Sequence, residues 1–331
     1  MEQEEQKVPW MNKRKAYNEA VEYLKGRKEG TIKGIKTPWA RFNDATVDGI
    51  EWHSMIVIAG RPGTGKTLIK DQIIRDAFKL NPHTYFRVLE YQFEMVAKAS
   101  AIREFSAITK KSYKYLCSAE SNILTDNELD ECITYAKEKV NDPIDIIEKP
   151  CTVNELEEYT SGWFEANSKV VNGKKVYTPG IVTIDHSLLL KKAAFEKDRM
   201  DTLYSLGECL TRLKRKYPII WLVLSQLNRN VDNVERTGDG KHGNYILDSD
   251  IFGSDALLQH ADVVVAFNRP ASKSISRYGP ERYIIDDDNI LVGHFLKVRN
   301  GDTRMSFFRA EFHRMSIVEI PPPPRETRKK L

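Results

Sequence analysis

The segment GRPGTGKT at positions 60–67 matches the pattern G-x-x-x-x-G-K-[S/T] at every fixed position. It directly follows an apolar run at 55–59, and a helix-patterned stretch begins at Leu68. A strand that turns through glycines into a helix directs backbone N–H groups and the positive end of the helix dipole at one point, which suits a phosphate group. The segment therefore predicts an α/β fold whose phosphate loop consists of Gly60, Arg61, Pro62, Gly63, Thr64, Gly65, Lys66 and Thr67.

Apolar runs alternate with helix-patterned stretches along most of the chain. Short apolar strands separated by helices are typical of a parallel sheet covered by helices on both faces. The pattern changes after Asn289, where apolar residues flank Asn300-Gly301, a strong hairpin signal, and Asn172-Gly173 predicts a smaller hairpin. We therefore expect a mainly parallel central sheet flanked by helices, with a C-terminal antiparallel hairpin. The predicted parallel strands are 54–59, 85–93, 180–184, 219–224 and 261–267, and the hairpin arms are 290–299 and 304–320.

Length and composition restrict the class of protein. At roughly 150 residues per domain, 331 residues fit two domains or one large α/β domain with terminal extensions. A hydrophobic share of 41% supports a substantial core, and a net charge of only +4 excludes a globally polybasic nucleic-acid binder. We expect a tail and a helix at 1–29, a nucleotide-binding domain at 30–320, and a disordered basic tail at 321–331.

The sequence lacks the usual signals for export, membrane insertion and zinc binding. No apolar run approaches the ~18 residues of a membrane span, and the first residues contain no apolar signal region. None of the 4 cysteines forms a Cys-x-x-Cys pair. These features predict a reduced cytoplasmic protein that does not contact membranes.

Two features of the sequence predict a magnesium site beside the phosphate loop. Lys66 would lie at the β- and γ-phosphates, and the hydroxyl of Thr67 would bind Mg²⁺. Asp185 ends the predicted strand 180–184, and an acid at the carboxyl end of a parallel strand is well placed to support the same ion.

Further polar residues at strand ends are candidates for catalysis. Glu94 and Glu90 lie on the same side of the 85–93 region, and either carboxylate could polarise an attacking water. Gln226 follows the strand 219–224, where a neutral amide could sense the γ-phosphate and pass its presence to the next loop.

Together these segments resemble the RecA-like ATPase domain of the DnaB-family replicative helicases over about residues 30–320. The resemblance implies ATP and Mg²⁺ as cofactors, hydrolysis at subunit interfaces, and a homo-oligomeric ring, which is a hexamer in this family. The phosphate loop alone is generic, whereas the pair LSQLNR and KVRNG is far more specific. The matching segments are IVIAGRPGTGKT at 56–67, FEM at 93–95, IVTID at 181–185, LSQLNR at 224–229, SD at 249–250, QHADVV at 259–264 and KVRNG at 297–301.

The resemblance implies roles for the residues that match the family's motifs. Glu94 matches the catalytic base, which favours it over Glu90, and Asp185 matches the Walker B acid. Gln226 matches the glutamine that couples nucleotide state to the DNA-binding loops.

Lys297 and Arg299 match the basic pair that reaches the γ-phosphate of the neighbouring subunit. Residues two apart on a strand face the same side, and a pair of cations beside a hairpin turn can stabilise transition-state charge in trans. A monomer would then lack part of its catalytic site.

The polar, glycine-containing stretch 229–254 corresponds to family segments that line the central channel and hold single-stranded DNA. Long loops in compact domains are usually functional or disordered. The DNA-binding candidates are the side chains of Arg229, Arg236 and Lys241 and the backbone N–H groups of Ile251, Phe252, Gly253 and Ser254.

The chain departs from the family pattern in three places. Phe252 stands where the family usually has an arginine, and His186 follows Asp185 where a tyrosine is common. The helical N-terminal domain that recruits primase has no counterpart here, and only a helix at 13–28, with one apolar stripe, corresponds to the family's linker helix. Such a short form resembles helicases of phages or mobile elements, which act in the host cytoplasm.

We therefore expect an ATP-dependent replicative DNA helicase that forms a ring and translocates on single-stranded DNA, with a primase, a loader or a polymerase as partners. One alternative is a RecA-like ATPase that does not unwind DNA, such as a recombination mediator or a strand-annealing motor. Another is a nucleotide-gated assembly. A DNA-packaging motor is less consistent with the sequence, which lacks a nuclease-like acid cluster.

Overall fold

The computed structural model of the protein describes residues 11–120, 123–233, 235–237 and 244–326. The chain divides into two compact units, Met1–Gly34 and Ile35–Leu331. The first unit contains helix α1 (Lys13–Glu29), which begins where the Asn12 side chain accepts a hydrogen bond from the Arg14 N–H and ends at a left-handed Gly30. The domain boundary expected at 29/30 stays a prediction.

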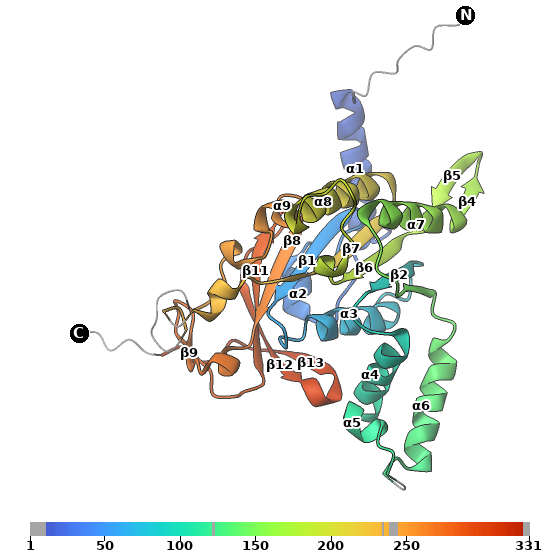
Figure 1. The fold of residues 1–331 in the computed structure, drawn as a ribbon. Helices are drawn as coiled ribbons and strands as arrows, with labels where there is room; N and C mark the ends of the chain where they lie inside the picture. The colour runs from blue at the N-terminus through green and yellow to red at the C-terminus, as the bar shows by residue number, and fades with distance from the viewer. Residues whose placement is uncertain (1–10, 121–122, 234, 238–243, 327–331) are drawn as a thin grey trace, which may run out of the picture. The chain divides into compact units, whose positions relative to one another are not determined.

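One large sheet dominates the second unit (Figure 1). Among the described residues it has 9 strands in the order β13-β12-β11-β8-β1-β7-β6-β2-β3. All neighbours from β8 to β3 pair in parallel, whereas β11, β12 and β13 pair antiparallel. The strands are β1 (Ser54–Gly60), β2 (Arg87–Gln92), β3 (Ile144–Ile147), β6 (Gly180–Asp185), β7 (Ile219–Gln226), β8 (Val263–Asn268), β11 (Ile290–Val298), β12 (Met305–Glu311) and β13 (Ser316–Ile320).

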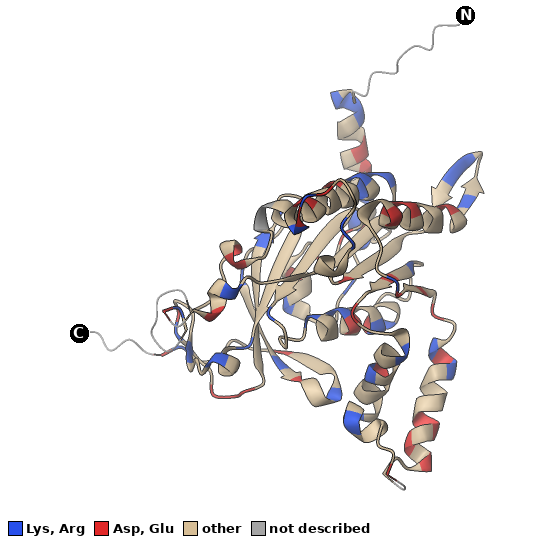
Figure 2. Cartoon of the chain, viewed as in Figure 1, with Lys and Arg blue, Asp and Glu red and all other residues tan. Residues whose placement is uncertain are grey.

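Helices cover both faces of the sheet because its central strands are apolar on both sides. Every residue of β1 is buried, and the consecutive residues Val57 and Ile58 belong to two different core clusters. Figure 2 shows the same contrast, with charged residues on helices and loops and very few on the central strands. One face packs against α2 (Ala40–Ala45) and α3 (Lys66–Leu80), and the other against α7 (Val153–Ala166), α8 (Arg199–Lys216) and α9 (Ser254–Leu258).

The remaining helices and strands lie outside these two layers. Helices α4, α5 and α6 follow one another in the chain segment that connects β2 to β3. Helix α6 begins with a capping box at Thr125. None of the described helices is long and apolar enough to cross a membrane. The bounds are α4 (Ala97–Thr109), α5 (Tyr113–Leu116), α6 (Asp126–Lys139), β4 (Ser168–Val171), β5 (Lys174–Tyr177), β9 (Arg277–Tyr278), β10 (Tyr283–Ile284), η1 (Ser187–Leu189), η2 (Arg229–Asp232), η3 (Asp248–Asp250), η4 (Pro270–Lys273) and η5 (Phe312–Arg314).

The predicted α/β fold is confirmed, including every predicted parallel strand and the small hairpin β4–β5 around Asn172-Gly173. One edge strand, β3, was missed because it is short and only partly buried. The predicted second arm of the C-terminal hairpin, 304–320, is wrong as a single strand. It is two antiparallel strands, β12 and β13, joined by η5, since Met315 takes a left-handed φ of 46° and reverses the chain.

The proline-rich segment 321–326 differs from the disordered tail that we expected. The Pro324 carbonyl accepts a hydrogen bond from the Ile284 N–H, and Arg325 forms a β-bridge with Tyr283. Glu326 forms ion pairs with Arg277 and Arg282. These contacts hold the segment on the β9–β10 hairpin, and residues 327–331 lie outside the described residues.

The apolar face of α8 offers a test of the core. Leu210 is fully buried, whereas Glu208 on the same helix is exposed. We expect Leu210→Ala to lower the free energy of unfolding by about 2–5 kcal/mol, because it removes buried methyl groups and leaves a cavity. Glu208→Ala should change it by less than about 0.5 kcal/mol. Urea denaturation measures both, and equal losses for the two variants would contradict the assigned helix orientation.

Candidate functional site

The phosphate loop connects the end of β1 to the start of α3. Gly65 has a left-handed φ of 82° at the N-cap of α3. Gly60 is required for a different reason, since a Cβ there would lie 2.3 Å from the Thr64 Oγ1. The Thr64 hydroxyl donates to the Arg61 carbonyl at 2.7 Å and closes the turn. The N-terminal end of a helix of 15 residues therefore faces the place where phosphates would bind.

The Lys66 ammonium lies inside this loop. It donates to the carbonyl oxygens of Gly60 at 2.8 Å and Arg61 at 3.2 Å. Burial lowers the pKa of Lys66, while the carboxylates of Asp185 and Glu94 act in the opposite direction. A phosphate group that entered the loop would replace weak carbonyl contacts with charge-assisted hydrogen bonds to the same amine.

Asp185 lies at the carboxyl end of β6, next to β7 and β2 in the sheet. Its side chain is buried, and its Oδ1 has no hydrogen-bond partner among the described residues. An unpartnered carboxylate oxygen beside the phosphate loop fits a hard cation such as Mg²⁺. The described residues contain no group of three or more His, Cys, Asp or Glu that could hold a metal by itself. A Mg²⁺ ion held by Asp185 and Thr67 would therefore take its other ligands from phosphate and water.

The structure separates the two candidate carboxylates, Glu90 on β2 and Glu94 just beyond its end. Glu90 is buried, and its Oε2 lies 3.1 Å from the Lys70 Nζ and also accepts a hydrogen bond from Gln92. Lys70 is fully buried and also pairs with Asp71 at 2.7 Å. Burial alone would lower the pKa of Lys70, but the Asp71 and Glu90 carboxylates outweigh it and raise that pKa. Glu90 therefore neutralises an interior charge and is not available to activate a water.

Glu94 lies just beyond the end of β2, with 57% of its side chain exposed. The Phe93 N–H donates to the Asp185 carbonyl at 3.0 Å, which ties this segment to the end of β6. The His186 Nε2 lies 3.8 Å from the Glu94 Oε2. Burial lowers the pKa of His186, while the carboxylates of Glu94 and Asp185 act in the opposite direction. An accessible carboxylate beside the phosphate loop has the placement of a general base.

Gln226 connects the sheet edge that carries the phosphate loop to the stretch 229–254, the candidate DNA loop. It pairs with Gly60 across β7 and β1, and its carbonyl accepts a hydrogen bond from the Phe252 N–H at 2.8 Å. Leu227 and Ile251 form a β-bridge next to this bond. A movement of the Gln226 backbone would therefore reach residues 251–252 through direct hydrogen bonds.

The structure changes the assignment of several DNA-binding candidates. The N–H of Phe252 donates to the Gln226 carbonyl, and the N–H of Ile251 donates to the Asp248 carbonyl at 3.2 Å, so both groups already have backbone partners in this conformation. Phosphate binding by these N–H groups stays a prediction. Phe252 itself is exposed, as is Arg229. Gly253 is the left-handed N-cap of α9, which begins at Ser254, and Lys241 lies outside the described residues.

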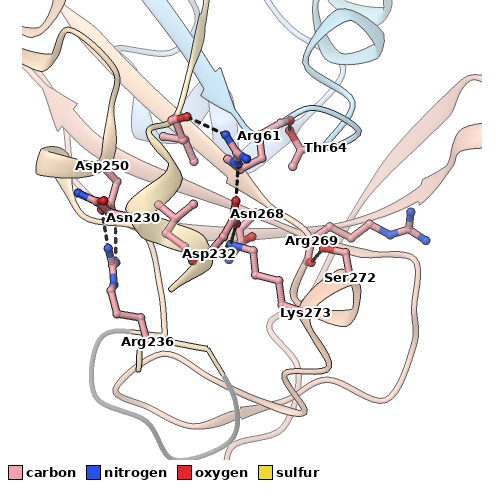
Figure 3. Close-up of polar contacts among 12 residues, drawn as sticks. Arg61, Thr64, Asn230, Asp232, Arg236, Asp250, Asn268, Arg269, Ser272 and Lys273 are labelled. Carbon is pink, nitrogen blue, oxygen red and sulfur yellow. Dashed lines mark hydrogen bonds and ion pairs between the residues drawn. The ribbon is translucent and has the colours of Figure 1, made fainter. Parts of the chain in front are cut away.

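Arg236 has a local partner in the structure. Its guanidinium makes a two-pronged ion pair with Asp250, at 2.6 and 2.8 Å (Figure 3). It also donates to the Tyr245 carbonyl at 2.9 Å. Asp250 is buried, so this pair ties residue 236 of the candidate DNA loop to residue 250 near its end. The geometry supports a structural role for Arg236 in place of a phosphate contact.

Sequence reasoning missed a second link between the phosphate loop and the candidate DNA loop. The Arg61 Nε lies 2.7 Å from the Oδ2 of Asp232 in η2, and Lys273 pairs with the other oxygen at 2.9 Å (Figure 3). Lys273 also donates to the Val231 carbonyl at 2.9 Å. These side chains line a cavity of about 550 Å³ between the phosphate loop, η2 and η4. No sequence spacing predicts the link, because its three members are far apart in the chain.

A cation–aromatic pair next to the phosphate loop was also missed. The Arg269 guanidinium lies 4.9 Å from the centre of the Phe312 ring. The same ring fills the space beside Gly65, where an added Cβ would lie 2.8 Å from its Cε1. A flat aromatic ring and a guanidinium beside a phosphate loop provide surfaces on which a nucleobase can stack.

Lys297 and Arg299 lie at the edge of the sheet opposite to the phosphate loop of their own chain. The register pairs Gly60 with Phe267, Phe267 with Gly293, and Val263 with Val298. Because β11 runs antiparallel to β8, it carries the chain away from the loop by about 3.3 Å per residue, or roughly 17 Å between Gly293 and Val298. The two cations therefore cannot complete the phosphate site of the subunit that carries them.

Comparison with known proteins identifies the family. The family model described as the DnaB-like helicase C-terminal domain matches residues 34–316. This match covers most of the chain. The protein belongs to the DnaB-like helicase C-terminal domain family.

Curated relatives of this family are similar in sequence to the chain at a low level. The replicative DNA helicase DnaB of Buchnera aphidicola subsp. Baizongia pistaciae is 23% identical over 239 residues, which is 72% of this chain and 47% of the relative. DnaB of Helicobacter pylori strain J99 is 25% identical over 249 residues, covering 73% of this chain and 46% of the relative. The chain thus spans about half the length of these DnaB proteins.

Solved structures confirm the RecA-like DnaB fold. One structure, described as an ATPase domain, has a TM-score of 0.74 and 19% identity, and the match covers 92% of this chain and 98% of that one. A DnaB-like replicative helicase, solved in a study of its interactions with primase, has a TM-score of 0.73 and 18% identity over 91% of this chain and 66% of that one.

The two candidate carboxylates, Glu90 and Glu94, can be distinguished by substitution. We expect Glu94→Gln to lower ATP turnover by about 10²–10⁴-fold while ATP binding persists, because it removes the general base. Glu90→Gln should lower the free energy of unfolding by about 3 kcal/mol, because it leaves the buried Lys70 with one partner fewer. Turnover assays, ATP titration and denaturation test both. A Glu94→Gln protein with full turnover would contradict the role of Glu94 as general base and make Glu90 the candidate for that role.

Proposed function

We propose that this protein is an ATP-driven replicative DNA helicase that works as a homo-oligomeric ring, hexameric as the family resemblance implies. The observation that carries the proposal is the position of Lys297 and Arg299. They lie at the sheet edge opposite to their own phosphate loop, so they can act on a γ-phosphate only in a neighbouring subunit. The DnaB relatives, which are named replicative helicases, and the intact hydrolysis residues support the same conclusion.

In the proposed reaction, the N–H groups of the phosphate loop and Lys66 hold the ATP phosphates. Thr67 and Asp185 would hold Mg²⁺, which neutralises phosphate charge when it is bound. Glu94 accepts the proton of the water that attacks the γ-phosphate. Arg299 and Lys297 of the next subunit stabilise the charge that develops during transfer.

Two contacts couple this reaction to the proposed DNA track. The Gln226 carbonyl holds Phe252, and Arg61 holds Asp232 in η2. A change in the phosphate loop on hydrolysis would shift both ends of the candidate DNA loop, in which Arg229 and Phe252 are exposed. We further propose a primase, a loader or a polymerase as partners. One similar structure, a DnaB-like replicative helicase, was solved in a study of its interactions with primase.

A RecA-like ATPase that does not unwind DNA is a second candidate, favoured by two features of the candidate DNA loop. The candidate DNA loop presents an exposed Phe252 where the family usually has an arginine, and its Arg236 is paired with Asp250. Such a loop has less positive charge available for the DNA backbone. A non-unwinding protein would hydrolyse ATP in the presence of single-stranded DNA without displacing a strand.

Strand displacement on a forked DNA duplex, with ATP and Mg²⁺, tests the helicase proposal. We expect unwinding by the unsubstituted protein and none by Lys66→Ala, because the variant loses the cation at the β- and γ-phosphates. DNA-stimulated ATP hydrolysis without unwinding, at every fork and salt concentration tried, would favour the second candidate.

Mixing variants tests whether the site is shared between subunits. We expect Arg299→Ala to lower ATP turnover by about 10³-fold or more while ATP binding remains. A mixture of Arg299→Ala and Lys66→Ala subunits should recover part of the turnover, since some interfaces then join an intact phosphate loop to an intact Arg299. No recovery in rings shown to contain both variants would contradict the shared site.

A further inference from the structure

The Arg299 side chain is held at the sheet edge by one carboxylate. The Arg299 Nη1 lies 2.9 Å from the Oδ1 of Asp262, and its backbone N–H donates to the Asp262 carbonyl at 2.8 Å. Half of the side chain, 52%, remains exposed. A guanidinium has five N–H donors in a fixed plane, so the contact through one nitrogen orients the group and leaves other donors facing outward.

Asp262 is itself fixed by contacts with other elements. Its Oδ2 accepts a hydrogen bond from the Met55 N–H at 2.9 Å and pairs with the Lys214 ammonium of α8. Its backbone N–H donates to the Met55 carbonyl at 2.9 Å. Only 16% of its side chain is exposed. The carboxylate that orients Arg299 is therefore anchored to β1 and α8.

The two ion pairs of Asp262 differ in their exposure. Lys214 is largely buried, with 10% of its side chain exposed, whereas Arg299 is half exposed. An ion pair with an exposed partner is weak and breaks readily, but a buried carboxylate must keep a compensating charge. If Arg299 turned toward a phosphate, Lys214 and the Met55 N–H would still satisfy Asp262.

We propose that Asp262 is a positioning residue for the trans-acting cation of this enzyme. It holds the Arg299 guanidinium facing outward at the subunit edge, and Lys214 keeps Asp262 compensated when the guanidinium moves to the nucleotide of the neighbouring subunit. This inference rests on the proposed function, because it requires Arg299 to act in trans. The Lys297 ammonium instead donates a hydrogen bond to the Leu258 carbonyl at 2.5 Å, so the proposed positioning by Asp262 applies to Arg299.

The test uses rings in which the substituted subunit cannot hydrolyse ATP itself. Wild-type subunits are mixed with an excess of Lys66→Ala subunits, which still offer Arg299 to a wild-type neighbour. The same mixture is repeated with Lys66→Ala subunits that also carry Asp262→Asn, Arg299→Ala or Asp287→Asn. Asp287→Asn is the matched control, because Asp287 pairs with the half-exposed Arg309 at 2.8 Å elsewhere on the sheet.

We expect Asp262→Asn neighbours to lower the kcat of the wild-type sites by about tenfold to hundredfold, with KM for ATP nearly unchanged, because the cation enters misoriented. Arg299→Ala neighbours should abolish turnover, and Asp287→Asn neighbours should have no effect. A purely structural defect would change the stability of the substituted subunit and not the kcat of an intact neighbouring site. Asparagine keeps an acceptor for the Met55 N–H, and Asp262→Glu, which keeps the charge but shifts the carboxylate, should lower kcat in the same way.

Two other results separate the failure of this inference from that of the proposed function. If Arg299→Ala neighbours abolish turnover while both Asp262 variants leave it unchanged, the shared site stands and the positioning role is wrong. If Arg299→Ala neighbours leave turnover unchanged in rings shown to be mixed, the trans-acting cation is wrong and the role of Asp262 falls with it.

Discussion

Strand direction within the central sheet determines where the functional groups of this protein lie. The parallel strands β1, β6 and β7 all end at one edge, so Gly60, Asp185 and Gln226 come together although they are far apart in the chain. The antiparallel strand β11 reverses this direction and delivers Arg299 to the opposite edge. A single sheet thus carries the phosphate loop at one edge and, at the other, the cation that we propose acts on the site of another subunit.

Buried ion pairs decide which charged residues are available for chemistry. Glu90 is committed to the interior Lys70, and Arg236 to the buried Asp250, so neither is free for a water or a DNA phosphate. Glu94 lies 3.8 Å from the His186 imidazole and keeps 57% of its side chain exposed, so it remains accessible. The cost of leaving a buried charge unpaired enforces this division, because the attraction between partners must offset their loss of hydration.

Most of the fold and the nucleotide side of the site could be predicted from local patterns. The phosphate loop, the strand before it and the β4–β5 hairpin at Asn172-Gly173 depend on residues within a few positions of one another. The Arg61–Asp232–Lys273 link and the Arg269–Phe312 pair could not be predicted, since they join side chains from distant segments. The left-handed Met315 was also unforeseen, because this conformation is uncommon for residues other than glycine.

The sequence by itself determined the α/β class, the phosphate loop and the order of motifs that resembles the DnaB family. These follow from covalent order and from the periodicity of apolar residues, which are properties of short segments. Only the tertiary structure decided that Glu94 is accessible and Glu90 is not, and that the N–H groups of Ile251 and Phe252 are already bonded. The physical reason is that burial and pairing depend on which distant segments meet, and strand register and direction in the folded sheet settle that.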